Sequence, residues 1–136
     1  MNLGHLNHVG VATPSIEDSL VLYRDVLGGV VGEPFDLPEQ GVRVCFVDAP
    51  NSQIELIEPL DDRSPIAGFL RKNPVGGQHH VCFEVADIHA AIAGLHEAGK
   101  RTLGEPRIGA HGTLIVFLHP KDMGGVLVEL METPGH

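Results

Sequence analysis

The sequence has 136 residues, 43% of them hydrophobic and 20% charged, which suits one compact domain or two small half-domains that share a core. Its formal net charge of −9 argues against nonspecific binding to nucleic acid or to an anionic membrane surface. The two cysteines predict no disulfide framework, and no apolar run approaches the roughly 20 residues that span a bilayer. Because residues 1–8 also lack the pattern of a signal peptide, we expect a cytoplasmic protein.

The first half of the chain predicts a strand, a helix and further strands. Residues 5–12 alternate as a strand that places His8 and Ala12 on one face. A helix is expected over residues 15–27, where Ser15 and Asp18 resemble a capping box. Its apolar stripe consists of Ile16, Leu20, Tyr23 and Leu27. Strands are expected at 42–47 and 53–57, and a short one around Val30.

The second half repeats this order after a partly structured linker. We assign residues 1–60 to module one, 61–76 to the linker and 77–136 to module two, all within a single domain. In the linker, Ser64-Pro65 predicts the start of a short helix that ends before Asn73-Pro74. In module two we expect a strand at 79–85, a helix capped by Asp87, and strands around Leu103, at 114–118 and at 126–131. Each module is therefore βαβββ, which predicts an α+β fold.

The two modules also repeat residues that can carry chemistry. His8 and His80 lie 72 residues apart, as do the two Gly-Glu-Pro segments that begin at Gly32 and Gly104. Glu55 and Glu129 lie 74 residues apart, and each interrupts an apolar strand. A duplicated module that repeats one histidine and one glutamate predicts a single site with four ligands.

Each of these four residues has a plainer interpretation when it is taken alone. A glutamate in an alternating strand can simply face water, and a strand histidine is more often a hydrogen-bonded structural residue than a ligand. The repeated set favours a metal, because two imidazoles and two carboxylates suit a divalent first-row ion with octahedral coordination. Four protein ligands leave two positions open, which predicts catalysis rather than a structural metal.

Five segments carry a resemblance to a known family: residues 7–12 (NHVGVA), 37–42 (LPEQGV), 54–60 (IELIEPL), 78–81 (QHHV) and 119–130 (HPKDMGGVLVEL). They resemble the vicinal oxygen chelate superfamily, which is glyoxalase-like, and within it the methylmalonyl-CoA epimerase family. The resemblance covers essentially the whole chain. It implies two tandem βαβββ modules that form a curved mixed sheet around a metal site, and a homodimer.

By this resemblance the metal ligands are His8, Glu55, His80 and Glu129, and the ion is a divalent metal such as Co, Mn, Ni or Zn. Glu129 would also be a catalytic acid/base. The implied reaction interconverts the R and S epimers of methylmalonyl-CoA, an acyl-CoA thioester, at C2 through an enolate chelated by the metal.

One departure and two rival functions qualify the resemblance. Val44 stands where the best-described epimerase pattern has a second catalytic glutamate, and Glu39, Asp36 or a metal-held water are the alternatives for that role. A glyoxalase I-type lyase or isomerase is the nearest rival, although no Lys or Arg precedes Arg24 to bind glutathione. A metal-free small-molecule-binding module is the rival from another class.

Overall fold

The structure is a computed structural model that describes residues 1–135. The chain divides into two compact units. The N-terminal unit comprises His8–His79, and the C-terminal unit comprises the described residues from 80 onward together with Met1–Asn7. No helix among residues 1–135 has both the length and the apolar character that a membrane crossing requires.

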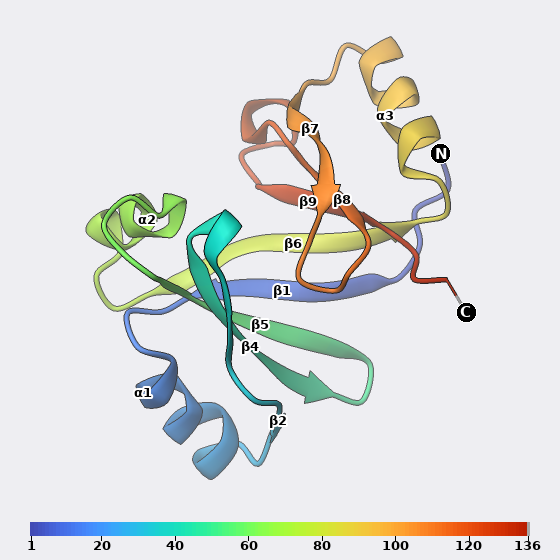
Figure 1. Cartoon of the computed structure of the whole chain (residues 1–136). Helices are drawn as coiled ribbons and strands as arrows, with labels where there is room; N and C mark the ends of the chain where they lie inside the picture. The colour runs from blue at the N-terminus through green and yellow to red at the C-terminus, as the bar shows by residue number, and fades with distance from the viewer. Residues whose placement is uncertain (136) are drawn as a thin grey trace. The chain divides into compact units, whose positions relative to one another are not determined.

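In the N-terminal unit the sheet has the order β2-β4-β5-β1, and β3 also pairs with β4 (Figure 1). Its elements are β1 (Leu6–Ala12), α1 (Ile16–Leu20), η1 (Val21–Val26), β2 (Val30–Val31), β3 (Phe35–Leu37), η2 (Pro38–Gln40), β4 (Val42–Ala49), β5 (Ser52–Pro59) and α2 (Pro65–Lys72). Strand β1 runs parallel to β5, whereas β2, β3 and β5 run antiparallel to β4.

The C-terminal unit has the equivalent sheet, with the order β6-β9-β8-β7 (Figure 1). Its elements are β6 (Gly77–Val85), α3 (Ile88–Glu97), β7 (Thr102–Ile108), β8 (Leu114–Leu118), η3 (Pro120–Asp122) and β9 (Val128–Glu132). Strand β6 runs parallel to β9, and β8 runs antiparallel to both β9 and β7. The C-terminal unit thus has the order βαβββ, and the N-terminal unit has the same order with β3 added, which confirms the expected α+β fold. The short β3 was not predicted.

The first residues of the chain belong to the C-terminal unit through contacts with Glu84. The N–H of Gly4 donates to the carbonyl oxygen of Glu84 at 2.8 Å, and the N–H of Glu84 donates to the carbonyl oxygen of His5 at 2.9 Å. The side chain of Asn7 donates to the Glu84 carboxylate at 3.0 Å. This set of bonds joins positions far apart in the sequence.

In both units a helix packs on one face of the sheet. In the N-terminal unit Ile16 and Leu20 of α1 pack against Cys45, Val47 and Leu56. The equivalent cluster of the C-terminal unit consists of Val85, Ile88, Ala91, Val116, Leu118, Val128 and Leu130. Because side chains alternate along a strand, the residues between these positions lie on the opposite face, and that face carries the predicted ligands.

The predicted helix starts are confirmed. The side chain of Ser15 accepts from the N–H of Asp18 at 3.1 Å, and that of Ser64 accepts from the N–H of Ile66 at 3.3 Å. Asp87 caps α3 by accepting from the N–H of Ala90 at 3.1 Å. These bonds satisfy N–H groups that the first turn of a helix leaves without an intrahelical acceptor.

The apolar stripe expected over residues 15–27 does not extend to its predicted end. Ile16 and Leu20 are buried, but Leu27 is 72% exposed. The cause is a wider turn over Val21–Val26, in which the N–H of Leu27 donates to the carbonyl oxygen five residues earlier, at Leu22, at 2.9 Å. One extra residue per turn rotates the following positions away from the core.

A second pair of helix contacts was not predicted at all. The carboxylate of Glu58, near the end of β5, accepts from the N–H of Ile16 at 3.0 Å. The carboxylate of Glu132, at the end of β9, accepts from the N–H of Ile88 at 3.1 Å. In each unit the last strand therefore holds the first turn of the helix that packs on the sheet.

Candidate functional site

In the N-terminal unit the predicted ligands His8 and Glu55 lie side by side and buried. They are 1% and 7% exposed, and the Nε2 atom of His8 lies 3.7 Å from the Oε2 atom of Glu55. Glu55 is opposite Gly10 on β1, two positions beyond His8, so both side chains lie on the face that α1 leaves uncovered. The interpretation that Glu55 faces water is therefore wrong.

The C-terminal unit repeats this arrangement with His80 and Glu129. Both are 5% exposed, and the Nε2 atom of His80 lies 3.1 Å from the Oε1 atom of Glu129. Glu129 is opposite Cys82, two positions beyond His80. Because burial of an unpaired carboxylate costs several kcal/mol or more, each glutamate needs the cationic or hydrogen-bonding partner that its histidine can provide.

Each pair has an aromatic neighbour that the sequence analysis missed. Phe46 is opposite Glu55 across β4 and β5, and Phe117 is opposite Glu129 across β8 and β9. The ring of Phe117 meets the ring of His80 edge to face, with centroids 5.3 Å apart and an interplanar angle of 85°. The repeat itself is the signal that could have found these residues, since the two phenylalanines lie 71 residues apart, close to the offsets of the ligands.

The position of the missing second glutamate is apolar and buried. Val44 is 1% exposed and belongs to the cluster of Ala12, Val42, Ile57 and Ile66. It is opposite Ile57, two positions beyond Glu55, so it does lie on the face that carries the His8–Glu55 pair.

The two side-chain alternatives to Val44 differ in position. Asp36 is opposite Arg43, adjacent to Val44 in β4, and therefore faces the other side of the sheet, where its carboxylate lies 3.6 Å from the Arg43 guanidinium. Glu39 is exposed in the turn η2. Strand alternation thus excludes Asp36 as the second catalytic acid/base. Of the two acidic side chains, only Glu39 remains an alternative for that role.

The chemistry of the four side chains fits a divalent metal. Imidazole nitrogen and carboxylate oxygen are the ligand types that Co, Mn, Ni and Zn accept. Two ligands bonded to one ion at about 2.1 Å lie roughly 3 to 4 Å apart. The nitrogen-to-oxygen separations of 3.7 Å in one unit and 3.1 Å in the other fall within or near that range.

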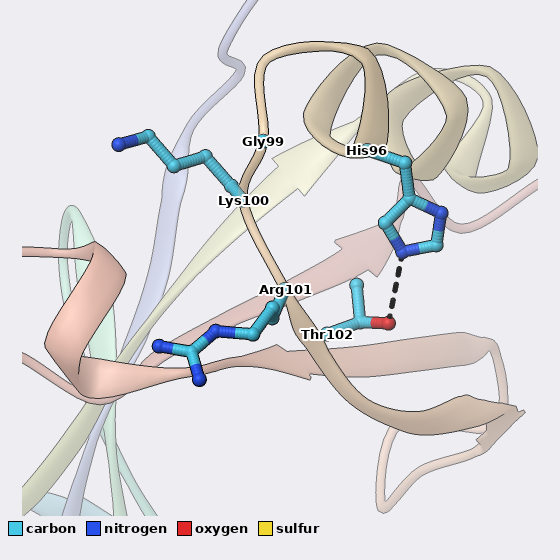
Figure 2. Close-up of a pocket in the computed structure, with 5 residues that line it drawn as sticks. All are labelled: His96, Gly99, Lys100, Arg101 and Thr102. Carbon is cyan, nitrogen blue, oxygen red and sulfur yellow. Dashed lines mark hydrogen bonds between the residues drawn. The ribbon is translucent and has the colours of Figure 1, made fainter.

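A hollow of about 360 Å³ lies elsewhere in the C-terminal unit, lined by His96, Gly99, Lys100, Arg101 and Thr102 (Figure 2). Nε2 of His96 lies 3.3 Å from Oγ1 of Thr102, as the dashed line in Figure 2 shows. Two guanidinium nitrogens of Arg101 donate to the carboxylate of Asp122, both at 2.9 Å. These bonds hold the pKa of the Asp122 carboxyl well below its usual range. None of the four predicted ligands lines this hollow. Of its two basic residues, Lys100 and Arg101, the arginine is already paired with Asp122.

Comparison with known proteins gives a consistent result. The model of the Glyoxalase/Bleomycin resistance protein/Dioxygenase superfamily matches residues 7–117. An ethylmalonyl-CoA/methylmalonyl-CoA epimerase of Cereibacter sphaeroides is 57% identical over 130 residues, which are 94% of this chain and 97% of that protein.

Two solved structures extend the similarity to the fold. The methylmalonyl-CoA epimerase of Mycobacterium tuberculosis superposes with a TM-score of 0.89 at 36% identity, covering 96% of this chain and 89% of that one. A variant of the Streptomyces coelicolor methylmalonyl-CoA epimerase, in complex with 2-nitronate-propionyl-CoA, gives the same TM-score at 35% identity and covers 98% of this chain and all of that one.

Proposed function

The chain belongs to the Glyoxalase/Bleomycin resistance protein/Dioxygenase superfamily, and from this premise we propose that it is an enzyme that epimerises methylmalonyl-CoA at C2. The observation that carries the proposal is the buried His–Glu pair that each unit holds on the face of its sheet opposite α1 or α3. The choice of substrate is supported by the Cereibacter relative, which is named for ethylmalonyl-CoA and methylmalonyl-CoA.

We propose His8, Glu55, His80 and Glu129 as the ligands of a divalent metal. When bound, such an ion supplies Lewis-acid stabilisation of the negative charge that develops on the substrate oxygens, an effect worth several kcal/mol of barrier. Burial of the four side chains supports this role, because a site from which water is excluded strengthens electrostatic interactions.

Glu129 is proposed as one acid/base group. The proton at C2 of methylmalonyl-CoA lies between a thioester and a carboxylate, so its removal leaves a delocalised anion. The Glu129 carboxylate, held 3.1 Å from Nε2 of His80, would take this proton on one face of the substrate. Epimerisation then requires that a proton return on the other face. Val44 cannot supply it, which leaves Glu39 or water for the second group.

We also propose that the protein forms a homodimer and that its metal is a divalent ion such as Co, Mn, Ni or Zn. Apolar side chains of the N-terminal unit that a partner could cover are exposed around α1, η1 and β2. They are Val21, Leu22, Val26, Leu27 and Val30. The predicted location in the cytoplasm stays a prediction.

The test is exchange of the C2 proton of methylmalonyl-CoA with deuterium from the solvent. Chelated protein is compared with protein reloaded with cobalt, manganese, nickel or zinc. We expect exchange that depends on the metal and falls by at least about 100-fold in Glu129→Gln, the range typical of a lost general base. Glu105→Gln, at an exposed position of the same unit, is the matched control and should exchange as the unmodified protein does.

The outcome also separates the rival functions. Folded, metal-loaded protein that shows no exchange with any of the four ions would refute the epimerase. Turnover of the glutathione hemithioacetal of methylglyoxal would then support the glyoxalase-type reaction. Failure of equilibrium dialysis to detect any bound divalent ion would favour the metal-free binding module.

A further inference from the structure

The proposed substrate is an anion and the protein carries a net charge of −9, so a cationic side chain near the proposed metal would favour binding. The chain has nine Lys and Arg residues. Four of them form ion pairs with aspartates, namely Arg24, Arg43, Arg63 and Arg101. Arg71 and Lys72 lie in the last turn of α2, where cations interact favourably with the helix terminus. Lys100, Arg107 and Lys121 remain, and none of the three forms an ion pair within residues 1–135.

Arg107 differs from the two lysines because it lies over an aromatic ring that neighbours the His80–Glu129 pair. The guanidinium carbon of Arg107 lies 5.6 Å from the centroid of the Phe117 ring, a cation–π arrangement. The same ring lies edge to face with His80, and Phe117 is opposite Glu129 in the sheet. Arg107 therefore reaches the proposed ligands of its own unit through a single aromatic side chain, while the arginine itself stays exposed to an incoming ligand.

An irregularity in β7 places Arg107 there. Leu103 is opposite Phe117 and Arg107 is opposite Ile115, so β7 advances by four residues over a stretch in which β8 advances by two. The extra residues include Gly104, whose φ of 82° is a conformation that favours glycine. Bulges of this kind re-aim the side chain that follows them. The extra residues thus have a structural role, which is to bring Arg107 opposite Ile115, two positions along β8 from Phe117.

The N-terminal unit has an apolar residue at the position equivalent to Arg107. Its own Gly-Glu-Pro segment lies between β2 and β3, and the residue that follows is Phe35, 72 positions before Arg107. Phe35 is opposite Val44, as Arg107 is opposite Ile115. Its ring lies 5.8 Å from that of Phe46, the counterpart of Phe117. Both units interrupt the strand at this segment and keep the aromatic ring, but only the C-terminal unit places a guanidinium over it.

We propose that Arg107 binds an anionic oxygen group of the acyl-CoA substrate beside the His80–Glu129 pair. The inference rests on the proposed function, because it takes the ligand to be an acyl-CoA. A guanidinium above an aromatic ring still has N–H groups that can donate to carboxylate and phosphate oxygens alike. The anion is therefore either the free carboxylate of the acyl group or a phosphate of the coenzyme.

The experiment measures binding directly by isothermal titration calorimetry of the metal-loaded protein with a mixture of the 2R and 2S epimers of methylmalonyl-CoA. The mixture is brought to the epimerisation equilibrium before the titration, so that the heat reports binding alone. The main variant is Arg107→Phe, which installs the residue of the other unit and retains contact with Phe117. Lys100→Gln removes the same charge from an exposed position of the same unit and is the matched control. Thermal melting of each variant checks that it is folded.

We expect Arg107→Phe to weaken binding about 10- to 100-fold, the loss typical of a hydrogen bond between charged groups, and Lys100→Gln to change it less than about 2-fold. Arg107→Lys, which keeps the charge but loses the planar fork, should fall between the two. Titration with a methylmalonyl thioester of N-acetylcysteamine, which has no phosphates, and with free CoA, which has no acyl carboxylate, identifies the anion: the arginine contacts the group whose removal abolishes the difference between variants.

A folded Arg107→Phe variant that binds methylmalonyl-CoA within about 2-fold of the unmodified protein would overturn the inference. So would an equal loss in Lys100→Gln, because it would show a general charge effect. These outcomes are distinct from failure of the proposed function, which is judged by deuterium exchange in the unmodified protein.

Discussion

Removal of the Glu132 carboxylate should destabilise the protein far more than removal of another surface acid. This carboxylate accepts from the N–H of Ile88, the first residue of α3, at 3.1 Å. Ile88 is 0% exposed, so water cannot replace the lost acceptor in Glu132→Ala. A buried donor that loses a charged acceptor costs about 1.5–3 kcal/mol of unfolding free energy. We therefore expect a loss of about 2 kcal/mol.

This free energy corresponds to a measurable shift in melting temperature. An unfolding entropy of about 2.1 cal/mol/K per residue over the 136 residues gives about 0.29 kcal/mol/K, so 2 kcal/mol lowers the Tm by about 7 °C. Differential scanning calorimetry measures it. Glu132→Gln keeps an acceptor oxygen and should lose about half as much. Glu97→Ala, at an exposed position of α3, should lose nothing.

The result that refutes this reasoning is a Tm reduction below about 2 °C in Glu132→Ala, or equal losses in Glu132→Ala and Glu97→Ala. Glu58→Ala repeats the test in the N-terminal unit, where the acceptor is lost by the N–H of Ile16, a residue only 2% exposed. Similar losses in both units would show that the duplication preserves the contact for its contribution to stability.

Two further predictions concern titratable groups away from the proposed site. Arg101 holds the pKa of Asp122 well below its usual range, so the stabilisation that this pair provides is present above about pH 4, the pKa of an unfolded aspartate, and is lost as the pH falls towards the folded value. The difference in urea stability between the unmodified protein and Asp122→Asn should accordingly be constant near neutral pH and shrink below pH 4; a constant difference down to pH 3 contradicts it. Burial raises the pKa of the Cys45 thiol, and both Cys45 and Cys82 are 0% exposed, so neither should react with a disulfide reagent at pH 7 before the protein is unfolded, whereas rapid reaction of native protein would refute this.

Local patterns in the sequence predicted the features that depend on local physics. The caps Ser15, Ser64 and Asp87 were identified because each side chain bonds an N–H only two or three residues away. The face of β1 was identified because alternation alone places His8 with Ala12. The internal repeat predicted the candidate ligands, because it identified the four side chains that the structure shows buried as two His–Glu pairs.

The features that were missed depend on pairing between distant segments. Nothing near Glu132 in the sequence indicates that it will meet Ile88, which lies 44 residues away. Phe117 has the appearance of an ordinary core residue until the register of β8 and β9 places it opposite Glu129. No local pattern in the sequence distinguishes Arg107 from the other cations, because the two extra residues in β7 become visible only when β7 is paired with β8.

The attachment of the first seven residues to the C-terminal unit has a consequence for the order of folding. The N-terminal unit is built from one continuous stretch, so it can form as soon as residue 79 has left the ribosome. Completion of the other unit must wait for contacts such as that of Asn7 with Glu84, which closes a loop of 77 residues. Because closure of a long loop slows folding, the formation of this late contact is expected to set the pace at which the finished protein appears, with the N-terminal unit already folded inside the loop.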